Sequence, residues 1–216
     1  MAAVSAQNLV TVGLIARIGC WAVAAFGALT GLGQAAWLLM YAARVDMIAL
    51  LGLVGLASLL FIVSFVISTI PVLIWVWRAH NNLKREGVSG LKFSPGWAVG
   101  SYFVPIMNLF VPFQAMRALY NRSHGEPEEL TEATADSVSS WWGCHIGALI
   151  FFAVVAITTA IDAIPGVWMT TPFWANAGLT VLYALLTAGS AFFLQKTIAR
   201  ITQAQLHGVG VAATFE

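Results

Sequence analysis

The residues best suited to chemistry are two cysteines and two histidines, Cys20, His80, Cys144 and His145. Thiolate and imidazole groups are the ligands that zinc and haem iron take in proteins. All four lie near the ends of apolar stretches, so a membrane arrangement could bring them to one depth. Paired ligand motifs such as Cys-x-x-Cys or His-x-x-x-His are missing from the sequence, however. We therefore interpret the histidines as interfacial residues and the cysteines as small residues with free thiols.

An acidic stretch is the other group that could bind a cation: Glu126, Glu128, Glu129, Glu132 and Asp136. Clustered carboxylates are ligands of divalent cations, but the glycine and the ligand spacing of helix–loop–helix calcium sites are absent here. We interpret the stretch as a solvated loop or a short helix. No nucleophile is paired with a base, and the long apolar stretches lack interior charges. The sequence thus predicts no catalytic, metal or cofactor site, and no enzyme.

These side chains belong to an unusually apolar chain, in which 60% of 216 residues are hydrophobic and 9% are charged. Soluble domains carry about a quarter of their residues as charges. The formal net charge of +1 excludes a nucleic-acid protein that works by bulk electrostatics, and two cysteines exclude a disulfide scaffold. An integral membrane protein remains.

Five uncharged stretches are each longer than the roughly 20 residues that cross a bilayer. Four of them are dense in Ala, Leu, Val, Ile and Phe. They predict an all-α integral membrane protein with four transmembrane helices in two hairpins, as a single domain over residues 1–216. The spans are expected at about 18–41, 48–77, 142–161 and 173–194. The fifth stretch, residues 93–116, contains three prolines, which interrupt a helix because they lack a backbone donor.

The distribution of positive charge supports four spans. Cytoplasmic loops of membrane proteins are enriched in Lys and Arg. With four spans and both termini inside, nine of the ten basic residues lie on the inner side and Arg44 alone lies outside. If residues 93–116 also crossed, the split would be five to five. We therefore predict a multi-pass protein with both termini in the cytoplasm.

Small residues in the first two predicted spans indicate where helices can approach each other closely. The first span contains Gly27 and Gly31, and the second contains Gly52 and Gly55. Such spacing allows tight packing between membrane helices. We predict that both pairs pack inside the bundle and not against a partner subunit.

The connection between the hairpins, residues 78–140, begins as a basic continuation of the second span and contains a proline-broken segment at 95–122. Ser94 before Pro95 is a typical helix start. Two geometries fit the remainder of this segment. In a re-entrant hairpin, Pro105 turns the chain near mid-depth and Asn108 caps the returning half. In the alternative, a kinked helix lies in the membrane interface throughout.

A further helical run begins at Pro112, and its spacing is amphipathic. One face carries Phe113, Met116, Leu119 and Tyr120, and the other carries Gln114, Arg117 and Asn121. This pattern favours a helix at the membrane surface, with its arginines toward lipid headgroups.

Two stretches of the chain resemble a known family. They read Trp75-Val-Trp-Arg-Ala-His-Asn-Asn-Leu and Phe93-Ser-Pro-Gly-Trp-Ala-Val-Gly-Ser-Tyr-Phe-Val-Pro-Ile-Met-Asn-Leu-Phe-Val-Pro-Phe-Gln-Ala-Met-Arg-Ala-Leu-Tyr. The pattern is similar to that of the bacterial membrane-protein family catalogued as domain of unknown function 4328. Ser101-Tyr102 departs from it, because a second tryptophan-like aromatic pair is expected there. The resemblance implies a multi-pass bacterial membrane protein and brings no activity.

From these features we expect a non-enzymatic accessory or interaction component of the bacterial cytoplasmic (inner) membrane. It would bind anionic lipid headgroups on its cytoplasmic face and a membrane-protein partner or a second copy of the chain, and no nucleic acid. The candidate interaction residues are Arg78, Asn82, Pro95, Trp97, Pro105, Asn108, Pro112 and Arg117. The alternative function is a small-solute or ion pathway through the segment around Asn108, since transporters bind substrates at broken helices.

Overall fold

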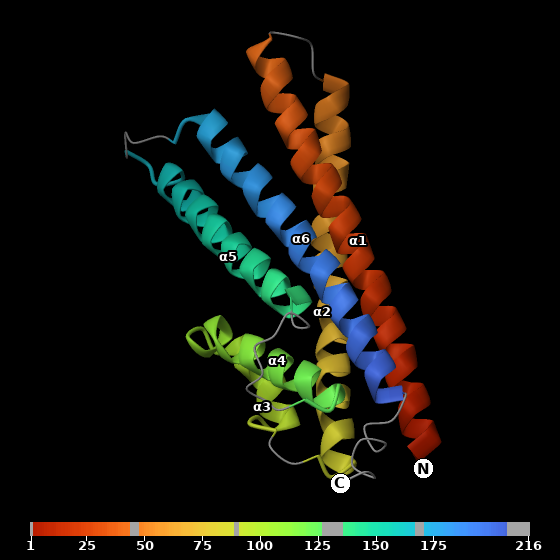
Figure 1. The fold of residues 1–216 in the computed structure, drawn as a ribbon. Helices are drawn as coiled ribbons and strands as arrows, with labels where there is room; N and C mark the ends of the chain where they lie inside the picture. The colour runs from red at the N-terminus through yellow and green to blue at the C-terminus, as the bar shows by residue number, and fades with distance from the viewer. Residues whose placement is uncertain (1, 44–47, 89–90, 127–135, 167–170, 207–216) are drawn as a thin grey trace.

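A computed structural model describes residues 2–43, 48–88, 91–126, 136–166 and 171–206 of the chain. The described residues form helices and connecting turns, without a strand. The elements are α1 (Ala2–Ala42), α2 (Ile48–Arg85), α3 (Pro95–Gly100), the short 3-10 helices η1 (Ser101–Phe103) and η2 (Met107–Leu109), α4 (Val111–Ser123), α5 (Asp136–Asp162) and α6 (Phe173–Leu206). The start of α1 and the end of α6 lie at the same end of an elongated bundle (Figure 1), which we call the termini end.

Four helices, α1, α2, α5 and α6, are long and apolar enough to cross a membrane. The prediction of an all-α membrane protein with four spans is therefore confirmed. All four helices are longer than the predicted spans: α1 begins at Ala2 and not near residue 18, α2 continues to Arg85, and α6 continues to Leu206.

The additional helical turns form a well-packed core at the termini end. Leu9 of α1, Leu83 of α2 and Ile201 of α6 are almost completely buried. The indole N–H of Trp75 donates a hydrogen bond to Thr202 Oγ1 over 3.0 Å, which satisfies the polar atom of a buried aromatic side chain. These turns are stabilised by protein contacts, so the spacing of charges along the sequence does not reveal them.

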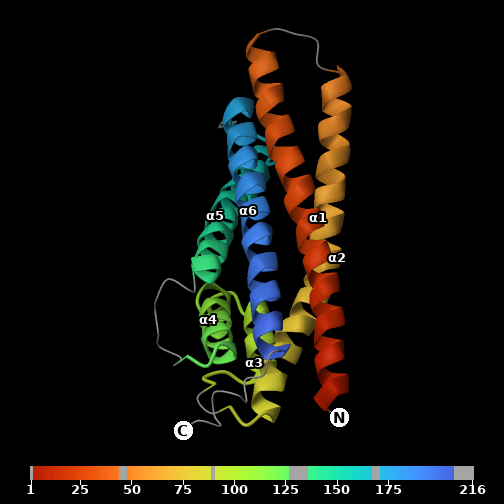
Figure 2. The same ribbon diagram turned by 45° about the vertical axis from the view of Figure 1, so that its right-hand side comes forward.

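The four long helices pack in the order α2–α1–α6–α5. Helices α1 and α6 each have two long neighbours, whereas α2 and α5 are not packed against each other along their described lengths. Figures 1 and 2 show this arrangement from two directions. The helices therefore form an open arc and not a closed four-helix bundle.

The glycines of α1 lie where this helix crosses α6. A Cβ atom at Gly27 would lie 3.2 Å from the carbonyl oxygen of Ala184, and one at Gly31 would lie 2.8 Å from the side chain of Leu185. A side chain at Gly27 or Gly31 would require these neighbours to shift, so glycine permits the close approach of the two helices. The prediction that Gly27 and Gly31 pack inside the bundle is confirmed.

The corresponding prediction for α2 is wrong. Gly52 and Gly55 are exposed, and a Cβ atom on either would meet nothing within 4 Å. The physical reason is the position of α2 at one end of the arc. Its only long neighbour there is α1 among the described helices, so most of its surface faces outward.

The proline-broken segment lies at the termini end, below the first turn of α5 (Figures 1 and 2). Helix α3 begins as predicted, because Ser94 Oγ accepts a hydrogen bond from the backbone N–H of Trp97 over 3.2 Å and Pro95 occupies the first turn. Pro105 lies between η1 and η2, and Pro112 lies in the first turn of α4. The re-entrant hairpin is not confirmed, and the depth of the segment in a bilayer stays a prediction.

Helix α4 is more buried than its amphipathic pattern predicts. Met116, Leu119 and Tyr120 are buried, as expected, but Asn121 of the predicted polar face is also only 1% exposed. The placement of Asn121 toward solvent or lipid headgroups was therefore wrong. Because α4 contacts α2, α5 and α6, protein covers most of its circumference and leaves Arg117 partly exposed.

Candidate functional site

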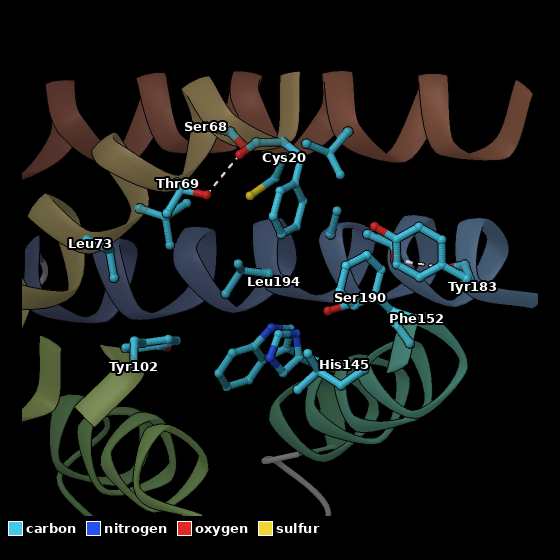
Figure 3. A pocket seen from close by; sticks show the side chains of 18 residues that line it. Cys20, Ser68, Thr69, Leu73, Tyr102, His145, Phe152, Tyr183, Ser190 and Leu194 are labelled. Carbon is cyan, nitrogen blue, oxygen red and sulfur yellow. Dashed lines mark hydrogen bonds between the residues drawn. The ribbon is translucent and has the colours of Figure 1, made fainter. Parts of the chain in front are cut away.

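A cleft lies between the two end helices of the arc, with α1 and α6 as its floor (Figure 3). Its volume is about 310 Å³, which is at the lower end of the roughly 300–1,000 Å³ of small-molecule sites. Phe65 and Thr69 of α2 and Phe152 of α5 line the cleft and remain exposed. They mark its mouth, which opens between two helices that would face lipid.

Most of the lining is apolar, and several of its hydroxyl groups bond to their own helices. Ser68 and Thr69 donate to the carbonyl oxygen of Phe65 over 3.1 and 2.8 Å. Thr187 donates to the carbonyl oxygen of Tyr183 over 2.8 Å. Hydroxyls bonded within a helix do not need a partner from a ligand. An occupant of the cleft would therefore meet mainly carbon surface.

His145 places a polar atom in this wall. Its ring lies 6.3 Å from the ring of Trp141 and 5.1 Å from that of Trp142, measured between centroids. The Nε2 atom is buried and has no hydrogen-bond partner. A buried polar atom without a partner is costly, and because Nε2 is buried it does not lie open to the cleft.

The cysteines and histidines considered as metal ligands are not brought together. Cys20 and His145 line the cleft, and Cys144 does not. His80 is buried elsewhere, where Nδ1 hydrogen-bonds to the carbonyl of Val76 over 2.9 Å and the backbone of α4 lies beside the ring. In the part of the chain that the structure describes, no three His, Cys, Asp or Glu side chains are grouped as for a metal ion. Of the acidic stretch, residues 128, 129 and 132 lie outside the described residues.

A second cluster, a buried polar network, lies at the termini end and is centred on Gln205 of α6. The side-chain amide of Gln205 donates to the carbonyl oxygen of Ala79 over 3.2 Å and to Ser123 Oγ over 3.0 Å. Its side-chain oxygen accepts from Asn82 Nδ2 over 3.1 Å. These bonds join α2, α4 and α6, so we assign the network a structural role: it holds α4 on the bundle.

Asn82 also links this network to the charged end of α2. Its amide donates to Glu86 Oε1 over 3.2 Å. Partial burial raises the pKa of the Glu86 carboxyl, and the hydrogen bond from Asn82 opposes that shift.

The predicted interaction residues divide into an inner and an outer group. The inner group consists of residues that are buried or bonded to another helix. Pro95 and Pro112 are buried, whereas Arg78 and Asn82 are partly exposed: Arg78 Nη1 donates to the backbone oxygen of Asn8 over 3.2 Å, and Asn82 belongs to the network. The outer group is Trp97, Pro105, Asn108 and Arg117, which are exposed or partly exposed. None of the eight is among the residues that line the cleft.

Pro105 and Asn108 of the outer group lie within an exposed apolar stretch of chain between η1 and α4. We call it the apolar tip, and it consists of Phe103, Val104, Ile106, Met107, Leu109 and Phe110. Phe103 and Ile106 are the most exposed of these, at 72% and 70%. The apolar run was visible in the sequence, but its exposure was not, because buried and lipid-facing residues have the same composition.

Aromatic rings connect the basic surface of α4 to the cleft. The guanidinium carbon of Arg117 lies 5.8 Å from the centre of the Phe113 ring, within cation–π range. Phe113 stacks on Trp142 at 6.2 Å, and Trp142 lies 5.2 Å from Trp141, which lines the cleft. A cationic group therefore lies a few rings away from the termini end of the cleft.

Comparison with known families finds one match that covers most of the chain. Residues 42–203 match the model of a family described as Domain of unknown function (DUF4328). The matched region contains all of α2, the proline-broken segment, α5 and most of α6. No curated protein and no solved structure matches the chain significantly.

Proposed function

The chain belongs to the family described as Domain of unknown function (DUF4328), and we propose that it is a non-enzymatic accessory component of the membrane that binds anionic phospholipid. Membership supplies no activity, so the proposal rests on geometry. The observation that carries it is the apolar tip, which projects at the termini end beside partly exposed cations.

The apolar tip is too exposed to be explained as ordinary protein surface. Contiguous apolar patches on a protein mark contacts with a membrane or with another protein. At the boundary of headgroups and acyl chains, apolar side chains enter the hydrocarbon while neighbouring cations remain at headgroup level. Lys92 and Arg117 are the basic residues that precede and follow the tip in the sequence, and they are exposed and partly exposed respectively.

The distribution of charge supports an anionic lipid as the partner. By their positions along the helices and the connecting segment, the lysines and arginines that the structure describes lie toward the termini end: Arg17, Arg78, Lys84, Arg85, Lys92, Arg117, Arg122, Lys196 and Arg200. By the positive-inside rule this end faces the cytoplasm. The proposed location is therefore the bacterial inner membrane, with both termini inside and the tip in the inner leaflet.

The first test measures the depth of the apolar tip. A single cysteine at Ile106, in a background without Cys20 and Cys144, is labelled with an environment-sensitive fluorophore in nanodiscs that contain phosphatidylglycerol. We expect lipids carrying a nitroxide in the upper acyl chain to quench this label more strongly than a water-soluble quencher does. The matched control is a label at Gln203, an exposed residue near the end of α6.

Equal quenching of both labels by the water-soluble quencher would refute insertion of the tip. Quenching that is strongest from a nitroxide near the end of the acyl chain would establish the re-entrant geometry. Quenching strongest from a nitroxide near the headgroup would establish the interfacial one.

The second test concerns the charge of Arg117. Each Lys or Arg near an anionic surface contributes about 1 kcal/mol, so Arg117→Gln is expected to lower the enrichment of phosphatidylglycerol over phosphatidylethanolamine in the co-purified lipid by about fivefold. The control is Arg200→Gln, which removes an equal charge from an exposed site on another helix, α6. If both variants change the enrichment equally, or neither does, the segment does not select lipid.

A further inference from the structure

We infer that the cleft between α2 and α5 holds one acyl chain of a phospholipid from the leaflet at the termini end. The inference deepens the proposed function and rests on it, because it says where the tail of a bound lipid lies. The proposed occupant is a phospholipid, and the test below distinguishes it from a free fatty acid.

The length of the cleft matches one leaflet. Along α6 its lining runs from Tyr183 to Leu194, which is eleven helical steps of about 1.5 Å, or about 16 Å. The hydrocarbon core of a bilayer is about 30 Å thick, so one leaflet supplies about half of that. An acyl chain that entered at the termini end would reach the far end of the cleft near the bilayer centre.

The open arc of helices leaves the cleft accessible from the lipid side, which favours lipid as its occupant. Because α2 and α5 are not packed against each other, the mouth between Phe65, Thr69 and Phe152 opens sideways toward the lipid. In a bilayer the medium on that side is acyl chains, and the hydroxyls of Ser68 and Thr69 bond to their own helix. An apolar tail therefore needs no polar partner over most of this surface.

The ester and headgroup of such a lipid would lie at the termini end of the cleft. Tyr102 and His145 line the cleft toward that end (Figure 3). Trp141, which precedes His145 by about one turn of α5, is also a lining residue. From Trp141 the ring contacts run through Trp142 and Phe113 to Arg117, the cation that we expect to meet the phosphate.

The inference is tested by photo-cross-linking. The full chain is placed in nanodiscs that contain phosphatidylglycerol with a diazirine in one acyl chain, irradiated, and digested for peptide mapping. We expect the label to concentrate on the facing residues of α2 and α5 that line the cleft. Thr69→Trp, which fills the mouth, is expected to reduce labelling of the α5 wall at least fivefold.

The matched control is Ile70→Trp, one residue further along α2. Ile70 is 62% exposed and does not line the cleft, so this variant adds an equal side chain to lipid-facing surface and should leave the labelling of the α5 wall unchanged. Size-exclusion profiles of both variants establish that they fold. Because Thr69 is exposed, tryptophan there does not enter the packed core.

Three results would overturn the inference. One is labelling spread evenly over the exposed faces of α2 and α5. Another is labelling of the α5 wall that Thr69→Trp does not change. The third is displacement of the label by free fatty acid at equimolar concentration, which would identify a fatty acid as the occupant.

A failure of the proposed function would give a different combination of results from a failure of this inference. Suppose that Arg117→Gln leaves lipid selection unchanged while Thr69→Trp still reduces labelling of the α5 wall. The proposal that the segment selects anionic headgroups then fails, and the proposal that the cleft holds an acyl chain is supported. If Arg117→Gln alters lipid selection and Thr69→Trp has no effect on labelling, the segment binds lipid and the cleft does not.

Discussion

Gly27→Leu is expected to destabilise the protein by about 3 kcal/mol, at the upper end of the cost of overpacking. A Cβ atom at this position would lie 3.0 Å from the Phe61 ring, 3.2 Å from the carbonyl oxygen of Ala184 and 3.3 Å from the Cβ atom of Ala188. Because one of these neighbours is backbone, α6 must shift to admit a larger side chain. The midpoint of thermal unfolding in detergent, followed by the reactivity of the buried Cys20 thiol, measures the effect.

The matched control is Gly55→Leu, in which the same substitution is made on α2. A Cβ atom there meets nothing within 4 Å, so a leucine would simply extend the lipid-facing surface, and we expect a change within about 0.5 kcal/mol. Equal unfolding midpoints for the two variants would show that α1 and α6 do not cross at Gly27.

Gln205→Leu is the second substitution with a large expected effect, and it acts on α4. It removes the hydrogen bonds that link Gln205 to Ser123 of α4 and to Asn82 of α2. Leaving their buried polar atoms without this partner costs about 2 kcal/mol in total, as Ser123 keeps its bond to Leu119 and Asn82 keeps its bond to Glu86. Hydrogen exchange of α4 should then quicken by roughly 30-fold, because exchange reports local opening.

Gln203→Leu serves as the control, since Gln203 lies on the same helix two residues away and is exposed. It should leave the exchange of α4 unchanged. If Gln205→Leu instead quickens exchange equally in α1, α2 and α6, the network stabilises the whole termini end and not the docking of α4.

Helix boundaries could be predicted where a local physical signal defines them. The start of α3 followed from Ser94 and Pro95, because capping and the fixed backbone angle of proline act within one turn. The start of α1 could not be predicted, because residues 2–16 carry no charge that marks an edge. Their helix is stabilised through contacts of residues such as Leu9 and Ala16 with helices distant in sequence.

The candidate site was less predictable than the helices. Its lining comes from four helices and η1, and the residues lie up to 174 positions apart, from Cys20 to Leu194. Asn121 illustrates the same difficulty: its spacing placed it on a polar face, whereas contacts with other helices bury it. In both cases the deciding partner belongs to another part of the chain.

The sequence by itself determined that this protein has four membrane-spanning helices. Crossing hydrocarbon requires a long apolar stretch, and both properties can be seen in that stretch alone, without knowledge of its neighbours. Only the tertiary structure decided which helices are neighbours, and hence that α2 and α5 leave a cleft between them. The reason is that lipid tails are as apolar as leucine. A helix face that packs on protein and one that contacts lipid therefore have similar amino-acid compositions. Gly27 and Gly55 look equivalent in the sequence, and only the structure shows that Gly27 is closely packed and Gly55 is not.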